Sequence, residues 1–233
     1  MPARTVRPLF SVAQPPCGRA QGSPLPMSFR TLLLFSLGLA GMRVTAAPPV
    51  STAGLRDGDV IFHASSSAQS RAIQLATKSR YSHCGLLFRR GGAWWVFEAV
   101  EPVKATPLAA WVKRGQGGHY AVRRLRDAAT ALTPAALTRM KTAAEQLQGK
   151  HYDLYFGWSD ERIYCSELVW KVYKSAVGRE LGQLQQLRDF DLTNPLVQQK
   201  LHERYGARLP LDEPVISPAC IFASPELVEV ATR

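Results

Sequence analysis

The sequence predicts one α+β domain, and three observations indicate this class. Short apolar segments with strand character fall in the first half of the chain, before residue 126. Segments with helical spacing and clear caps dominate the second half. No internal repeat and no linker composition interrupts residues 47–233. Because strands come early and helices come late, we expect a single domain of mixed, segregated elements.

Residues 1–46 are predicted to lie outside this domain. Residues 1–26 are rich in Pro, Arg and Ser and show no apolar periodicity. Met27 begins a pattern typical of a signal peptide, with a short positive segment, an apolar run over residues 31–41 and small residues after it. We therefore expect translation to start at Met27, export to the periplasm or the exterior, and a mature domain of residues 47–233. A short anchor that is not cleaved is the alternative.

The charge of the domain is moderate. The whole chain carries a formal charge of +11, but residues 1–46 hold five arginines and no acidic residue, which leaves +6 for the rest. The basic residues are scattered, whereas a nucleic-acid interface needs a concentrated basic stripe. We therefore expect no nucleic-acid partner.

Four strands are expected in the first half of the chain, at residues 60–62, 81–88, 94–100 and 119–125. The Arg-Arg-Gly-Gly segment at residues 89–92 is typical of a turn and makes the second and third strands a hairpin. A turn centred between Arg90 and Gly91 places His83 directly opposite Glu98 on one face, with Cβ atoms ~5 Å apart. An even shift of the turn leaves the two residues diagonal neighbours, and an odd shift separates them.

Four helices are expected, at residues 68–78, 134–148, 165–177 and 195–205, with a short helical tail from residue 217. An N-cap followed by proline precedes two of them, at Thr133-Pro134 and Asn194-Pro195. A glycine follows three of them and is typical of a helix end.

Cys165 begins the third of these helices and is a candidate nucleophile. It shares one apolar stripe with Leu168, Val169 and Val172. At a first helical turn, unpaired backbone N–H groups and the helix dipole favour a thiolate. The helix alone leaves an inert core cysteine as the alternative.

His83 and Glu98 form a candidate couple for that nucleophile. A carboxylate beside an imidazole selects its tautomer and stabilises the imidazolium, which is the orienting role in a nucleophile–base–orienter triad. Leu, Phe and Trp residues surround both positions, so a buried couple is favoured over a surface salt bridge.

Four blocks in this order resemble the YiiX-like family: GDVIF (58–62), YSHCG (81–85), FEAV (97–100) and YCSELV (164–169). This family is the circularly permuted branch of the papain-like NlpC superfamily and is distantly similar to lecithin:retinol acyltransferases. The resemblance continues through residues 189–193 and 215–218. It implies a papain-like core, with a small antiparallel sheet packed on the cysteine helix. The histidine block precedes the cysteine block, as the permutation implies.

The resemblance implies a cysteine hydrolase with Cys165 as nucleophile, His83 as base and Glu98 as orienting residue. The resemblance also implies that the hydrolase works through an acyl-enzyme intermediate and needs no metal or organic cofactor. The segment ending at Tyr152 is similar to the Gly-x-Pro-Tyr segment whose tyrosine borders the oxyanion site. Here histidine replaces the proline, and the spacing to Cys165 is one residue longer. Tyr152 is therefore a candidate oxyanion donor with Tyr164 as its rival, and the backbone N–H of Cys165 is the second donor.

Two substrate classes remain open. N-acyl lipids or other acylated small molecules are favoured, because no cell-wall-binding module is recognisable. Peptide links of cell-wall fragments are the alternative. A lipid substrate would bring peripheral contact with a membrane. A non-catalytic lipid- or ligand-binding module is a further alternative, disfavoured because all three triad positions are filled.

The other cysteines and histidines are expected to lie outside the site. Cys84 has the opposite strand parity to His83 and should point away from it. Cys84 and Cys220 are expected to be buried thiols, with a disulfide as the alternative; three cysteines in residues 47–233 leave at least one thiol free. No close cluster of cysteines and histidines indicates a metal site. The remaining histidines, expected to be surface or structural residues, are His63, His119, His151 and His202.

Overall fold

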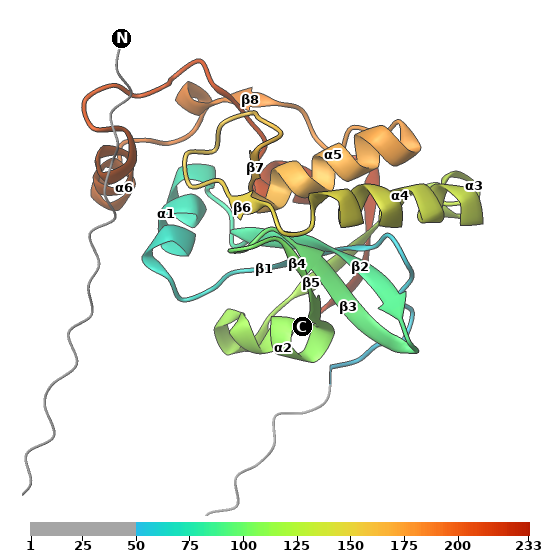
Figure 1. The fold of residues 1–233 in the computed structure, drawn as a ribbon. Helices are drawn as coiled ribbons and strands as arrows, with labels where there is room; N and C mark the ends of the chain where they lie inside the picture. Colours follow the sequence, from blue (N-terminus) through green and yellow to red (C-terminus); the bar gives the residue numbers. More distant parts are fainter. Residues whose placement is uncertain (1–49) are drawn as a thin grey trace, which may run out of the picture. The chain divides into compact units, whose positions relative to one another are not determined.

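The computed structural model describes residues 50–233, which belong to one compact unit (Figure 1). The predicted signal segment lies outside the described residues. A six-stranded antiparallel sheet forms the centre, in the order β10-β5-β1-β2-β3-β4. Helices cover both of its faces, with α4 and α5 on one side and α2 on the other (Figure 1). Within residues 50–233, no helix has the length and apolar character to cross a bilayer.

Four of the six central strands were predicted. The strands are β1 (Val60–His63), β2 (His83–Arg90), β3 (Ala93–Glu98), β4 (Lys104–Pro107), β5 (Ala121–Leu125) and β10 (Leu227–Thr232). β4 is short and partly polar, so alternation did not reveal it. β10 takes the place of the end of the expected helical tail and pairs with β5 at the edge of the sheet. Two minor pairs are β6 (His151–Tyr152) with β7 (Arg162–Ile163), and β8 (Gln185–Gln186) with β9 (Pro214–Val215).

The turn of the hairpin lies one residue later in the chain than predicted. Arg90 pairs with Ala93, so Gly91 and Gly92 alone form the turn. Both glycines have positive φ, at 57° and 80°, as a two-residue hairpin turn of this hand requires. The direct pairing of His83 with Glu98 is therefore wrong. The two residues are diagonal neighbours on one face, which is the outcome expected for an even shift.

The helices follow the predicted caps closely. They are α1 (Ala68–Thr77), α2 (Leu108–Arg114), α3 (Ala128–Ala131), α4 (Pro134–Leu147), α5 (Cys165–Val177), α6 (Pro195–Tyr205) and α7 (Pro218–Phe222), with single turns η1 (Gln116–Gly118) and η2 (Leu187–Asp189). Thr133 and Asn194 accept hydrogen bonds from the first turns of α4 and α6. Gly178 ends α5 in the left-handed region. The sequence did not predict α2, which lacks a side-chain cap.

Alternate residues of the central strands enter two separate cores. Cys84, Leu86 and Phe88 of β2 belong to the core that α5 covers. Leu87 belongs to the core that contains Trp111 of α2. Side chains of a strand alternate between faces, so this division sets which helix each strand residue meets. Chemistry that combines residues of α5 and α2 must therefore take place at an end of the sheet.

Candidate functional site

Cys165 lies at the start of α5, where its side chain is almost completely buried. It is the first helical residue and is 2% exposed. A hydrogen bond from the Cys84 thiol and the charge of His83 outweigh burial and hold the pKa of Cys165 well below the usual range of a thiol. These two contacts favour a thiolate at this position, whereas the sequence predicted one from the helix N-terminus.

Cys84 lies beside Cys165 and not away from the site. The strand parity was correct, since Cys84 and His83 face opposite sides of the sheet. The expectation was wrong because Cys84 faces the side on which α5 packs, so that its thiol meets Cys165. Burial and the Cys165 thiolate both raise the pKa of Cys84. Cys84, Cys165 and Cys220 are all free thiols, and Cys220 is only half-buried.

His83 and Glu98 meet at the end of the hairpin that is opposite its turn. The Nε2 atom of His83 is 2.7 Å from Oε2 of Glu98. Burial alone would lower the pKa of His83, but the Cys165 thiolate and the Glu98 carboxylate raise it to about 9. His83 therefore interacts with both Cys165 and Glu98. The structure brings the three residues of the predicted triad together, with the imidazole between the thiol and the carboxylate.

Glu98 is completely buried and accepts hydrogen bonds from four side chains. Besides His83, they are Thr106 at 2.7 Å, Trp111 at 2.9 Å and Arg114. Burial would raise the pKa of Glu98, but these donors and the charge of His83 lower it to about 2. Sequence reasoning missed Thr106, Trp111 and Arg114, because β4 and α2 were not predicted. The three-residue spacing of Trp111 and Arg114 on one helix was the available signal.

His63 is a further residue of the site that the sequence assigned to surface or local structure. It pairs with His83 across β1 and β2 and is buried. Its ring stacks on Trp111 at a centroid distance of 3.8 Å and lies 5.2 Å from the His83 ring. Burial and the charge of His83 lower the pKa of His63 to about 3. His63 is thus an uncharged side chain that lies beside the charged imidazole of His83.

The two candidate oxyanion donors occupy different surroundings. Tyr152 in β6 hydrogen-bonds to Cys165, and burial together with the thiolate raises the pKa of Tyr152. The hydroxyl of Tyr164 instead accepts a hydrogen bond of 3.1 Å from the backbone N–H of Ile216. Of the two tyrosines, Tyr152 is therefore better placed to act on a group bound at Cys165.

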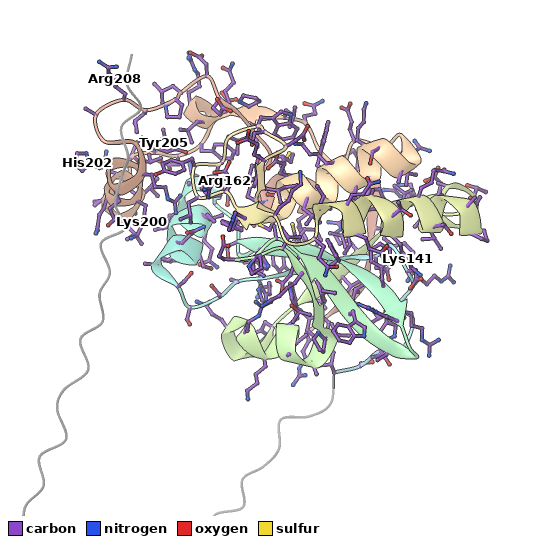
Figure 2. All side chains as sticks on the ribbon, in the orientation of Figure 1. Lys141, Arg162, Lys200, His202, Tyr205 and Arg208 are labelled. Atoms are coloured by element: carbon purple, nitrogen blue, oxygen red, sulfur yellow. The ribbon has the colours of Figure 1, made fainter. Side chains whose placement is uncertain are left out.

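The remaining histidines lie on the surface, as expected. His151 forms an exposed ion pair with Glu101, with Nδ1 2.7 Å from Oε1. His119 is exposed, and His202 is exposed on α6, where Figure 2 labels it.

An apolar cavity reaches Cys165 from the side of α1 and α6. The space measures about 690 Å³ when the part that is open to solvent is included. Apolar side chains from both helices and from residues 187–192, which precede α6, line it. Among them are Ala72, Ile73, Leu187, Phe190, Val197 and Leu201. Lys200 of α6, labelled in Figure 2, borders the same cavity. This cavity offers an apolar group a binding place next to the thiolate.

A second cleft lies on the side of His83; we call it the polar cleft because most of the residues that line it are polar, and the apolar residues Ile73, Ala99, Val100 and Leu154 line it as well. The space measures about 1080 Å³ when the part that is open to solvent is included. His83 and Tyr152 line it together with Ser65, Ser67, Gln69, Ser82 and Arg114. Gln69 and Ile73 of α1 border both spaces. The Cys165–His83 pair therefore lies between an apolar cavity and a polar cleft.

Comparisons with known proteins bear on the family and the fold of the chain. Residues 54–231 match the family model described as permuted papain-like amidase enzyme, YaeF/YiiX, C92 family. The uncharacterized protein YiiX of Escherichia coli K12 is 49% identical over 174 residues, which cover 75% of this chain and 85% of that protein. A crystal structure described as metalloprotein yiiX from Escherichia coli O157:H7 superposes with a TM-score of 0.74 at 49% identity, covering 77% of this chain and 98% of that one. These matches confirm the resemblance and the α+β, papain-like fold, and the chain belongs to the permuted papain-like amidase family, YaeF/YiiX, C92.

Proposed function

We propose that this protein hydrolyses the amide or ester bond of an N-acyl lipid or another acylated small molecule through a thioester on Cys165. The observation that carries the proposal is the position of the Cys165–His83 pair, with an apolar cavity on one side and a polar cleft on the other. An acyl chain fits the first space by burial of apolar surface. A polar amine fits the second.

The reaction begins with attack of the Cys165 thiolate on the carbonyl carbon of the substrate. The backbone N–H of Cys165 and the hydroxyl of Tyr152 stabilise the resulting oxyanion. The His83 imidazolium donates its proton to the leaving nitrogen, the C–N bond breaks, and the amine departs. Neutral His83 then removes a proton from water, which attacks the thioester and releases the carboxylic acid. Glu98 keeps the imidazole oriented through both steps.

The position of His83 sets the direction in which the substrate binds. The group that protonates the leaving nitrogen must lie within hydrogen-bond reach of it. His83 lines the polar cleft, so the leaving amine lies there and the acyl group extends into the apolar cavity. A cell-wall peptide, the second candidate substrate, would place a polar acyl portion in that apolar cavity. The lining therefore favours the acyl lipid.

No step of the proposed reaction passes through a metal. The relative from Escherichia coli O157:H7 is described as a metalloprotein. In residues 50–233 of this chain, no group of three or more His, Cys, Asp or Glu side chains is arranged to hold a metal ion. The Glu98 carboxylate is instead engaged with His83, Thr106 and Trp111.

Export is part of the proposal, with the signal segment predicted at residues 27–46. A lipid substrate would then be met at a membrane surface outside the cytoplasm. N-terminal sequencing of exported protein should begin near Ala47. An intact segment of residues 29–40 in that material would contradict cleavage.

The test of the chemistry compares substrates and cysteines. We expect the wild-type protein to release lauric acid from N-lauroyl amides faster than it cleaves cell-wall peptides, with a fluorophosphonate-type or acyl probe labelling Cys165. Cys165→Ala should abolish release. Cys220→Ala, which changes a half-buried free thiol that does not line the apolar cavity, is the matched control and should keep it. Equal activity of Cys165→Ala and the wild type would refute the proposal.

A further inference from the structure

Arg114 is the one arginine or lysine among the described residues that line the polar cleft. It is the last residue of α2, and its Nη2 group donates a hydrogen bond to Oε1 of buried Glu98. Its side chain remains 41% exposed. A guanidinium has five N–H donors, so the contact with Glu98 leaves further donors for the cleft.

Resting on the proposed function, we propose that Arg114 binds a carboxylate on the leaving amine, so that the substrate is an N-acyl amino acid. The cleft holds the leaving group because His83 lines it, and Arg114 lines the same cleft. A guanidinium matches a carboxylate through two parallel N–H···O bonds. The acyl chain in the apolar cavity and the carboxylate at Arg114 then fix the two ends of the substrate on either side of the amide.

Glu98 prepares Arg114 for this contact. Its carboxylate is completely buried and is held by Thr106 and Trp111 as well as by His83. Arg114 is therefore anchored at one end of its guanidinium before substrate arrives. Anchoring reduces the side-chain entropy that is lost on binding. The charge of Glu98 is shared between the Arg114 and His83 cations, so it does not cancel Arg114 alone.

The acidic residue that lines the cleft, Glu101, is already engaged. Glu101 accepts hydrogen bonds from the ring of His151 and from the backbone N–H of Tyr152. These two contacts, rather than one with Arg114, engage its carboxylate. Arg114 could instead serve only to neutralise Glu98. That role would affect every substrate equally, whereas recognition affects only a substrate with a carboxylate.

The experiment compares N-lauroylglycine with N-lauroylethanolamine, which differ in a carboxylate against a hydroxymethyl group. We expect wild-type kcat/KM to favour N-lauroylglycine by at least about tenfold, the value of a hydrogen bond to a charged group. Arg114→Gln should bring the ratio close to one, and Arg114→Lys should give an intermediate ratio. Because the ratio cancels losses common to both substrates, disturbance of Glu98 does not obscure the result. Lys113→Gln, an exposed cation on the same helix, is the control and should leave the ratio unchanged.

Binding to Cys165→Ala, measured by calorimetry, separates this proposal from the proposed function. N-lauroylglycine should bind more tightly than N-lauroylethanolamine, and adding Arg114→Gln should remove the difference. Preference in binding without turnover by the wild type would refute the hydrolysis and retain the carboxylate site. Turnover without preference would refute the carboxylate site alone. Equal losses for both substrates in Arg114→Gln would also overturn it, and if that variant does not fold, Arg114→Lys decides in the same way.

Discussion

Glu98 and Glu167 are both completely buried carboxylates, yet their pKa values move in opposite directions. Glu98 in β3 accepts hydrogen bonds from four side chains, and its pKa is lowered to about 2. Glu167 lies in the first turn of α5, where Lys171 is 2.8 Å away and the Tyr164 N–H 3.3 Å away. Burial dominates there and raises the pKa of Glu167 to about 7.

The comparison shows that donors, and not burial, decide whether a buried carboxylate remains charged. Two cations and two neutral donors surround Glu98, so it keeps the negative charge that orients and charges His83. Glu167 has a single partly exposed lysine and a backbone N–H, which suffice to begin a helix but not to offset desolvation. In the proposed function, Glu98 serves the chemistry of the site, whereas Glu167 lies at the start of the helix that presents Cys165.

The largest contrast is expected in activity. His83→Ala should nearly abolish kcat/KM, and Glu98→Gln should be about one to two orders of magnitude less severe, as for the orienting acid of other triads. Glu167→Gln should leave kcat/KM near the wild-type value, since its side chain does not touch His83. The double variant His83→Ala with Glu98→Gln should be scarcely worse than His83→Ala, because Glu98 acts through His83. Losses that multiply would show that Glu98 has an independent task.

The pH dependence of turnover and alkylation should separate the same two residues. His83 is protonated up to a pKa of about 9, so turnover should fall as the pH rises through that value. In Glu98→Gln this alkaline limb should move to lower pH, because a charge that raises the pKa of His83 is gone. Glu167→Gln should not move it.

Iodoacetamide at pH 6–7 should modify Cys165 well before Cys84 or Cys220, and equal rates would refute the thiolate–imidazolium pair.

Stability should depend on pH with opposite signs for the two carboxylates. Glu98, with a folded pKa of about 2 against 4.5, stabilises the fold above pH 4.5 and loses this contribution as the pH falls through 2. Glu167, with a folded pKa of about 7, destabilises the fold as the pH rises from 4.5 to 7. Each effect is on the order of 3 kcal/mol in the free energy of unfolding. Denaturant unfolding of the wild type, Glu98→Gln and Glu167→Gln at pH 2, pH 4 and pH 8 measures both effects, and slopes of equal sign for the two carboxylates would contradict the comparison.

The smallest effect is expected from a single neutral donor. Thr106→Val removes one of the hydrogen bonds to Glu98 and should cost about 1 kcal/mol of unfolding free energy. It should also raise the pKa of Glu98 slightly and leave that of Glu167 unchanged. Titration of the two carboxyl groups by NMR would test this, and a shift at Glu167 would show that the two regions are coupled.

Local signals predicted most of the fold and the centre of the site. Cap-plus-proline pairs located α4 and α6, and the apolar stripe after Cys165 located α5. The hairpin register was one turn position off, because the left-handed glycines at 91 and 92 place the turn. The surroundings of Glu98 could not be predicted, because Trp111 and Arg114 come from a helix without a cap signal. Their contacts depend on how that helix packs, which no local pattern encodes.

The order of the elements along the chain has a consequence for biosynthesis. His83 and Glu98 leave the ribosome first, the cysteine helix follows, and β10 comes last, where it pairs with β5 to complete the sheet. The pKa of His83 is raised in part by the Cys165 thiolate, which is synthesised later. Until the second half of the chain has been made, His83 therefore lacks this contribution to its positive charge. The Cys165–His83 pair can therefore form only after both halves of the domain have been made.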